Sequence, residues 1–143
     1  MTRSRAALAG AAAATAWAAV QPLDKQLFRC DYSDVALLGK AVTRSRLWPV
    51  AGLAIHAANG AAFGLAYREL QQRTGYERRR LALVLALGEH ITLYPLSALV
   101  DSRHPASGEK GVPAHLLSSP RAFAQATWRH ALFGVLLGRF AGD

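Results

Sequence analysis

Four apolar blocks, separated by charged stretches, constrain the fold of this chain more than any other feature of its sequence. They run approximately over residues 6–23, 47–67, 81–100 and 122–140. Each is close to the ~20 residues that an α-helix needs to cross ~30 Å of hydrocarbon at ~1.5 Å per residue. We therefore predict an all-α fold, a bundle of four transmembrane helices that forms a single integral membrane domain over residues 1–143.

A soluble, alanine-rich helical bundle is the alternative fold. The surface helices of such a bundle repeat polar residues with a period near ~3.6. Residues 81–87 and 131–137 show little polar alternation. These segments are apolar around most of the helix, which favours a lipid environment.

The first block also has features of a secretory signal, since Arg3 and Arg5 precede an alanine-rich stretch. Cleavage there would leave three spans and would remove half of an internal repeat. We expect the first helix to be retained.

The net charge of +8 is explained by membrane orientation rather than by nucleic-acid binding. With the amino terminus inside, the inner segments 1–5, 68–80 and 139–143 hold 8 Lys and Arg. The outer segments 24–46 and 101–129 hold 9, although together they are more than twice as long. The positive-inside rule then predicts a multi-pass protein of the bacterial cytoplasmic membrane with both termini in the cytoplasm.

Two motifs of the form His-x-x-x-Gly-x-x-x-Gly indicate an internal repeat. The first is HAANGAAFG, with His56, Gly60 and Gly64, and the second, at an offset of 74, is HALFGVLLG, with His130, Gly134 and Gly138. Pro22-Leu23 recurs as Pro95-Leu96 at an offset of 73. The chain is thus predicted to contain two parallel two-helix units, about 1–68 and 78–143.

The two outer segments differ in character. Residues 31–46 place Val35, Leu38 and Val42 at helical spacing after Asp34, a candidate helix cap, which predicts a short amphipathic helix on the membrane surface. Trp48, followed by a proline, then begins the second span at the interface. Residues 101–121 are rich in Pro, Gly and Ser and predict a loop.

The four motif glycines predict close helix packing. Glycines at i and i+4 leave a stripe without side chains, along which a neighbouring helix can approach. The stripes of Gly60 with Gly64 and of Gly134 with Gly138 are expected to pack helices within the chain or between chains, so a homo-oligomer or a membrane partner protein is one expectation besides the lipid bilayer.

Ionisable residues occur at mid-depth in three of the predicted spans: His56, Glu89, His90 and His130. Such groups are costly in lipid and normally face the interior of the bundle with a partner. Asn59, Thr92 and Tyr94 are candidate hydrogen-bonding partners. One interpretation is a structural cluster in which Glu89 accepts a hydrogen bond from a histidine.

Two functional interpretations of this cluster stay open. Glu89 and the imidazoles could relay a proton or an ion, as in a small oligomeric transporter or a proton-coupled carrier. Alternatively, His56 and His130 could ligate a metal ion or the iron of a b-type haem, as in a membrane redox protein.

Other candidate chemistry is weaker. Asp101, His104, Glu109 and His115 form a scattered donor set in one loop, and the single Cys30 has no partner for an intramolecular disulfide. The sequence contains no Walker loop, nucleophile elbow, Cys-x-x-Cys or zinc-protease motif.

The chain resembles small four-span bacterial membrane proteins of unknown function. The residues that carry the resemblance are Glu89-His90, Tyr94-Pro95-Leu96, His104-Pro105, Trp128-Arg129-His130, Phe133-Gly134 and the HAANGAAFG run. It implies a four-span topology and no particular activity. We therefore expect a non-enzymatic structural or accessory membrane component, with no cofactor.

Overall fold

The computed structural model describes residues 1–142, and in these residues the fold is all-α, as predicted. Its only β pairings are isolated bridges within the described residues. The elements are α1 (Arg3–Phe28), α2 (Asp34–Val42), α3 (Trp48–Thr74), α4 (Arg78–Leu93), the 3-10 helix η1 (Tyr94–Leu96), α5 (Ser97–Arg103) and α6 (Pro120–Phe140).

Three of the helical segments described are long and apolar enough to cross a membrane. They are α1, α3 and the run from α4 through α5, Arg78–Arg103. These segments coincide with the first three predicted blocks, which supports a membrane protein. The fourth block forms α6, whose first half carries Arg121, Gln125 and Arg129.

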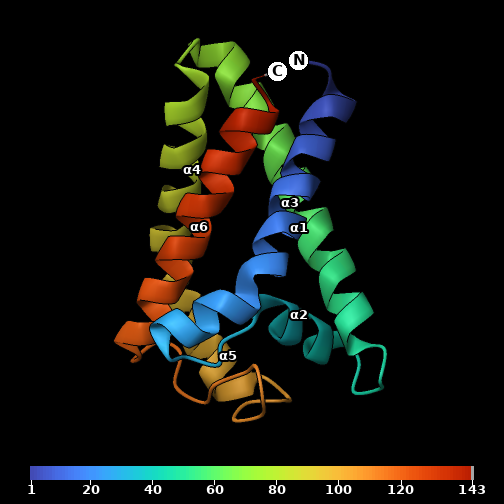
Figure 1. Cartoon of the computed structure of the whole chain (residues 1–143), viewed down its shortest axis with the longest axis vertical. Coiled ribbons are helices and arrows are strands. Elements are labelled where there is room, and N and C mark those ends of the chain that lie inside the picture. Colours follow the sequence, from blue (N-terminus) through green and yellow to red (C-terminus); the bar gives the residue numbers. More distant parts are fainter. Residues whose placement is uncertain (143) are drawn as a thin grey trace.

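The helices are arranged as two pairs (Figure 1). Helix α1 packs along α3 and α4 packs along α6, while α1 joins the two pairs by contacting α6. Both termini lie at the same end as the turn between α3 and α4, because Arg68 donates to the Met1 carbonyl and Arg78 to the Gly142 carbonyl. Helices α2 and α5 lie at the opposite end (Figure 1).

The third predicted span is not one uninterrupted α-helix. Helix α4 ends at Leu93 and the chain makes the 3-10 turn Tyr94–Leu96 before α5 begins. Pro95 lies in this turn, and a proline removes one backbone donor and clashes with the preceding helical turn. Pro22 lies within α1, which continues through it to Phe28.

The predicted short helix of the first outer segment is present as α2, but its cap is different. Ser33, not Asp34, is the N-cap residue, and its hydroxyl accepts a hydrogen bond from Ala36 N. Asp34 instead turns its carboxylate to Arg129. Helix α2 packs on α3, where Gly39 and Gly52 bring the two backbones together.

The motif glycines of α3 lie against α1. A Cβ atom added to Gly60 would stand 2.5 Å from the carbonyl oxygen of Gly10 and 2.6 Å from Ala14 Cβ. One added to Gly64 would collide with the Ala6 carbonyl. Only a residue without a side chain permits this approach.

The motif glycines of α6 lie against α4 in the same way. A Cβ atom on Gly134 would stand 2.8 Å from Leu83 Cα, and one on Gly138 would stand 3.0 Å from Arg79 Cα. All four glycines therefore pack helices within the chain.

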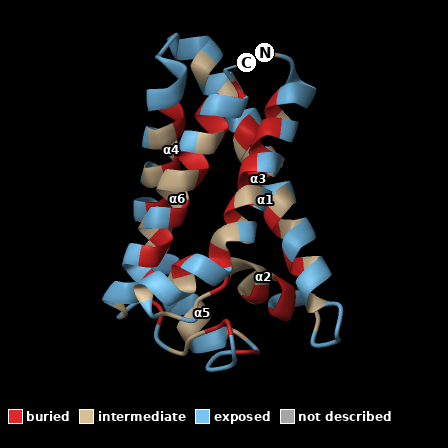
Figure 2. Cartoon of the chain, in the orientation of Figure 1, coloured by how far each residue is buried: buried red, intermediate tan, exposed pale blue. Residues whose placement is uncertain are grey.

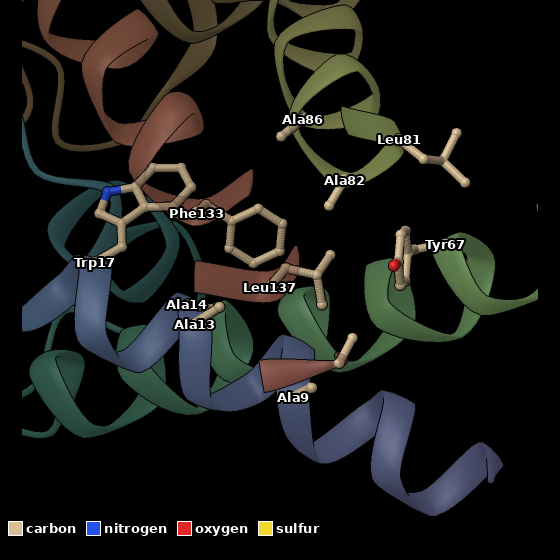
Figure 3. Close-up of a cluster of buried hydrophobic side chains, with 11 residues drawn as sticks. Ala9, Ala13, Ala14, Trp17, Tyr67, Leu81, Ala82, Ala86, Phe133 and Leu137 are labelled. Atoms are coloured by element: carbon tan, nitrogen blue, oxygen red, sulfur yellow. The ribbon is translucent and has the colours of Figure 1, made fainter. Parts of the chain in front are cut away.

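A small apolar core joins the two pairs. Trp17, Tyr67, Leu81, Phe133 and Leu137 are its large members, and Ala141 with alanines of α1 and α4 completes it (Figure 3). Figure 2 shows buried residues where the helices face one another. Apolar side chains also cover the outer faces, where Val84 and Ile91 are each 65% exposed. Lipid is the solvent that suits such a surface.

Candidate functional site

A cavity of about 460 Å³ lies between the two helix pairs. Helices α1, α3, α4 and α6 all contribute to its lining, together with Leu37 and Leu38 of α2 and Leu116 of the loop before α6. Six residues predicted from the sequence line it together: His56, Asn59, Glu89, His90, Tyr94 and His130. Thr92, by contrast, is exposed and is not part of the lining.

The three imidazoles and one indole form a chain of ring contacts in this cavity. The Trp17 ring lies 4.8 Å from the His56 ring and 4.9 Å from the His130 ring, centroid to centroid. The His130 ring lies 4.8 Å from the His90 ring at an interplanar angle of 31°. Residues from all four long helices thus meet at one place.

The hydrogen bonds of His90 and His130 define their neutral tautomers. His130 Nδ1 lies 2.8 Å from the Ala126 carbonyl oxygen, so Nδ1 carries the hydrogen and donates it. Thr127 donates its hydroxyl hydrogen to the Phe123 carbonyl and must therefore accept from His90 Nε2, 2.9 Å away. The lone pairs at His90 Nδ1 and His130 Nε2 remain available.

His56 contributes a second buried imidazole to this cavity, beside that of His90. The His56 residue is only 6% exposed, and its Nε2 atom has no hydrogen-bond partner among the described residues. A buried polar atom without a partner is uncommon in a folded protein and requires an explanation. A bound molecule would supply the missing partner.

Glu89, Asn59 and Tyr94 occupy less enclosed positions. Glu89 is half-buried and Asn59 is exposed, and within the described chain neither side chain forms a hydrogen bond. The expected hydrogen bond from a histidine to Glu89 is thus not part of this structure. Tyr94 donates its hydroxyl to the Leu116 carbonyl at 2.7 Å, which fixes the ring at the cavity wall.

Arg129, which belongs to the predicted outer segment 101–129, is fully buried beside this cavity. Its Nε and Nη2 atoms each lie 2.6 Å from an oxygen of Asp24, and its Nη1 lies 2.7 Å from Asp34 Oδ2. Nη2 also donates to the Tyr32 carbonyl, and Gln125 donates to Asp24. Helices α1, α2 and α6 are joined by this network.

A sequence signal for this network was available. Arg129 falls inside the fourth apolar block, where an arginine needs a carboxylate partner. Asp24 and Asp34 are acidic residues close to the ends of apolar segments. Their pairing with an arginine so distant in the chain could not be deduced from spacing.

Asp34 is held in its ionised form by this arrangement. Burial by itself would raise the pKa of the Asp34 carboxyl, but the charge of Arg129 and the hydrogen bond from Tyr32 outweigh it. The pKa of Asp34 therefore lies below its usual value.

The site does not fit a haem held by His56 and His130. The Trp17 indole contacts both imidazoles, so it fills space that a macrocycle between them would need. The part of the chain that the structure describes also contains no group of three or more His, Cys, Asp or Glu residues placed to hold a metal ion.

Three of the four scattered donors of the second outer segment make structural contacts, and the fourth, His115, is exposed. The Asp101 carboxylate accepts from Leu116 N and Leu117 N, and Glu109 pairs with Lys40 and Arg44. The His104 ring lies 2.8 Å from the Leu37 carbonyl oxygen. The Asp101 contacts bind the loop to α5, and the contacts of Lys40 and Leu37 bind it to α2.

Cys30 is a half-buried free thiol beside this region. Burial raises the pKa of this thiol, which keeps it in the neutral form.

No protein-family model, no curated protein and no solved structure matches this chain. The fold and the site define its class as a helical protein with helices long and apolar enough to cross a membrane and, between them, a largely apolar cavity that contains three imidazoles and a carboxylate of α4. The function has to be argued from the chemistry of that cavity.

Proposed function

We propose that this chain is a non-enzymatic, four-span component of the bacterial cytoplasmic membrane that binds a small molecule in the cavity between its helix pairs. The observation that carries the proposal is the convergence of three imidazoles on one cavity, with His56 Nε2 buried and unpartnered among the described residues. In a cluster that served packing alone, the buried polar groups would bond to one another.

The distribution of side chains on α6 supports its role as the fourth span. Gln125 and Arg129 point inward and are fully buried, whereas Phe123, Trp128 and Val135 are 42%, 45% and 55% exposed. Polar groups inside and apolar groups outside is the arrangement that lipid requires. The two carboxylates that pair with Arg129 reduce the cost of placing its charge in the membrane.

Equivalent contacts in the two helix pairs support an internal duplication. Gly60 packs on Gly10 and Gly64 on Ala6, while Gly134 packs on Leu83 and Gly138 on Arg79. The glycines are related by an offset of 74, and their partners on α1 and α4 by an offset of 73. The latter offset also relates Trp17 to His90, so both copies place an aromatic ring at the cavity.

Orientation follows from the arginines at the end that holds both termini. The three consecutive residues Arg78, Arg79 and Arg80 lie there, together with Arg3 and Arg5. The positive-inside rule then assigns the terminal end to the cytoplasm.

Binding can be tested by blocking the cavity. Asn59→Phe would fill the cavity from an exposed position on α3, and Leu53→Phe is a matched control because Leu53 lies on the same helix, exposed and outside the lining. Three aromatic probes of similar size serve as ligands: phenyltrimethylammonium, tert-butylbenzene and benzenesulfonate. Equilibrium dialysis of the purified protein in non-ionic micelles measures binding.

The proposal predicts that at least one probe binds saturably to the wild type and to Leu53→Phe, and that Asn59→Phe abolishes this binding. The micelles themselves take up the same amount of probe in both samples, so this uptake cancels when the binding of the two variants is compared. Equal binding to the two variants would contradict the proposal.

A small carrier is the second candidate function, favoured by Glu89. This carboxylate lines the cavity, is half-buried and has no hydrogen-bond partner in the described chain, so a transported ion or proton could occupy it. Glu89→Gln should abolish proton or solute flux in proteoliposomes. Unchanged flux in this variant would rule out the carrier.

A further inference from the structure

We infer that the cavity selects a small organic cation, an aromatic or aliphatic molecule that carries a quaternary or protonated amine. The inference rests on the proposed binding function and names its ligand class. Three features of the cavity support this inference. They are the negative charge of the residues around it, the hydrogen-bonding groups of its lining and the aromatic rings in its walls.

The charge around the cavity is negative. Arg129 pairs with both Asp24 and Asp34, so one positive charge meets two negative ones and the network retains one negative charge. Asp34 is the member of this network that lines the cavity. Glu89 adds a second carboxylate from α4, and no Lys or Arg belongs to the lining in the described residues.

The lining offers more free acceptors than free donors, since Trp17 Nε1 is its one buried side-chain donor without a partner in the described residues. In the tautomers described above, His90 Nδ1 and His130 Nε2 carry lone pairs, and both of their N–H groups are used by Thr127 and the Ala126 carbonyl. Tyr94 likewise donates its hydroxyl to the Leu116 carbonyl, not to the cavity. A ligand that bears N–H groups or a positive charge complements such a surface, and an anion does not.

Aromatic rings form part of the apolar walls, together with aliphatic side chains such as Leu37 and Leu116. Trp17, Phe63, Tyr94 and Phe133 all line the cavity. The faces of such rings attract cations, and they are used in proteins to bind quaternary ammonium groups. Arg129 already makes this kind of contact beside the cavity, since its guanidinium carbon lies 5.1 Å from the centre of the Tyr32 ring.

The charge of the ligand can be isolated with isosteric probes. Phenyltrimethylammonium and tert-butylbenzene have the same shape and differ in one charge, and benzenesulfonate carries the opposite charge. Binding is measured for the wild type, for Glu89→Gln and for Glu69→Gln. The last variant makes the same charge change on α3, where Glu69 pairs with Arg73 and lies outside the cavity lining.

We expect saturable binding of phenyltrimethylammonium, at least about tenfold weaker binding of the other two probes, and about tenfold or greater weakening of cation binding by Glu89→Gln. Glu69→Gln should bind like the wild type. If tert-butylbenzene or benzenesulfonate binds as tightly as the cation or more tightly, and Asn59→Phe abolishes this binding, the cation selectivity is overturned. The binding function would then stand. If none of the three probes binds, both the cation inference and the binding function fail.

Discussion

Arg129 of α6 and Asp24 of α1 form a bidentate ion pair in which the arginine side chain is wholly buried and the aspartate side chain is 2% exposed. The two residues are 105 positions apart in the chain. Their pairing fixes how the two helix pairs meet, because α1 belongs to one pair and α6 to the other. It also places a carboxylate, Asp34, at the wall of the cavity.

Removing Arg129 should be severely destabilising. Arg129→Met leaves Asp24 and Asp34 without their cationic partner in a buried site, which we expect to lower the free energy of unfolding by about 3–5 kcal/mol. Arg129→Lys should restore little of the loss, because an ammonium cannot replace the planar bidentate contact. Denaturant titration in mixed micelles measures the change.

Arg121→Met is the control for this variant, since Arg121 is exposed at the start of α6. It should change stability by less than about 0.5 kcal/mol. An Arg129→Met protein as stable as the Arg121→Met protein would show that the buried pair does not hold the bundle together.

Replacing a helical glycine by alanine adds one methyl group, which should be tolerated at Gly88 and not at Gly60. Gly60→Ala forces α3 away from α1, because the new Cβ would meet Gly10 O and Ala14 Cβ, and overpacking of this kind costs about 1–3 kcal/mol. Gly88→Ala meets nothing within 4 Å and should stabilise α4 by up to about 1 kcal/mol. Thermal unfolding in detergent distinguishes the two, and equal effects would argue against the close approach of α1 and α3.

Acid should remove the contribution of Asp34 to stability. The pKa of Asp34 is lower in the folded protein than its ordinary value of 3.8, because Arg129 and Tyr32 favour the carboxylate despite burial. Its contribution is therefore complete above 3.8 and is lost as the pH falls through the lower folded pKa. Asp34→Asn should be less stable than the wild type at neutral pH.

The difference between these two proteins should then narrow at pH values below 3.8. Unfolding midpoints measured for both proteins across this range provide the comparison. A difference that stays constant on acidification would contradict an ionised Asp34 that is stabilised by Arg129.

Much of this arrangement could be predicted from the sequence. The lengths of the apolar blocks predicted the long helices, and the depth of the ionisable residues within the blocks predicted which of them line the cavity. His56, Glu89, His90 and His130 fall at similar depths in their helices, and inward-facing polar groups at equal depth converge. Block length did not reveal the 3-10 turn at Pro95, which depends on a local backbone clash.

The long-range partners could not be predicted in this way. Nothing in the spacing of the chain pairs Asp24 with Arg129, and the position of Trp17 against His56 and His130 depends on how two helix pairs are docked. The predicted repeat offers one usable signal, because Trp17 and His90 are related by the same offset of 73 as the two Pro-Leu pairs. Sequence periodicity predicts which face of a single helix is buried. It does not predict which other helix packs against that face.

The most direct test of the central claim is the response of the five histidines to a bound probe. Nitrogen NMR of the histidine-labelled protein in micelles reports the tautomer and environment of each ring. On addition of phenyltrimethylammonium, the signals of His56, His90 and His130 should shift together, while those of His104 and His115, which lie outside the cavity lining, should not. Equal shifts of all five rings, or shifts confined to His104 and His115, would contradict a binding site between the two helix pairs.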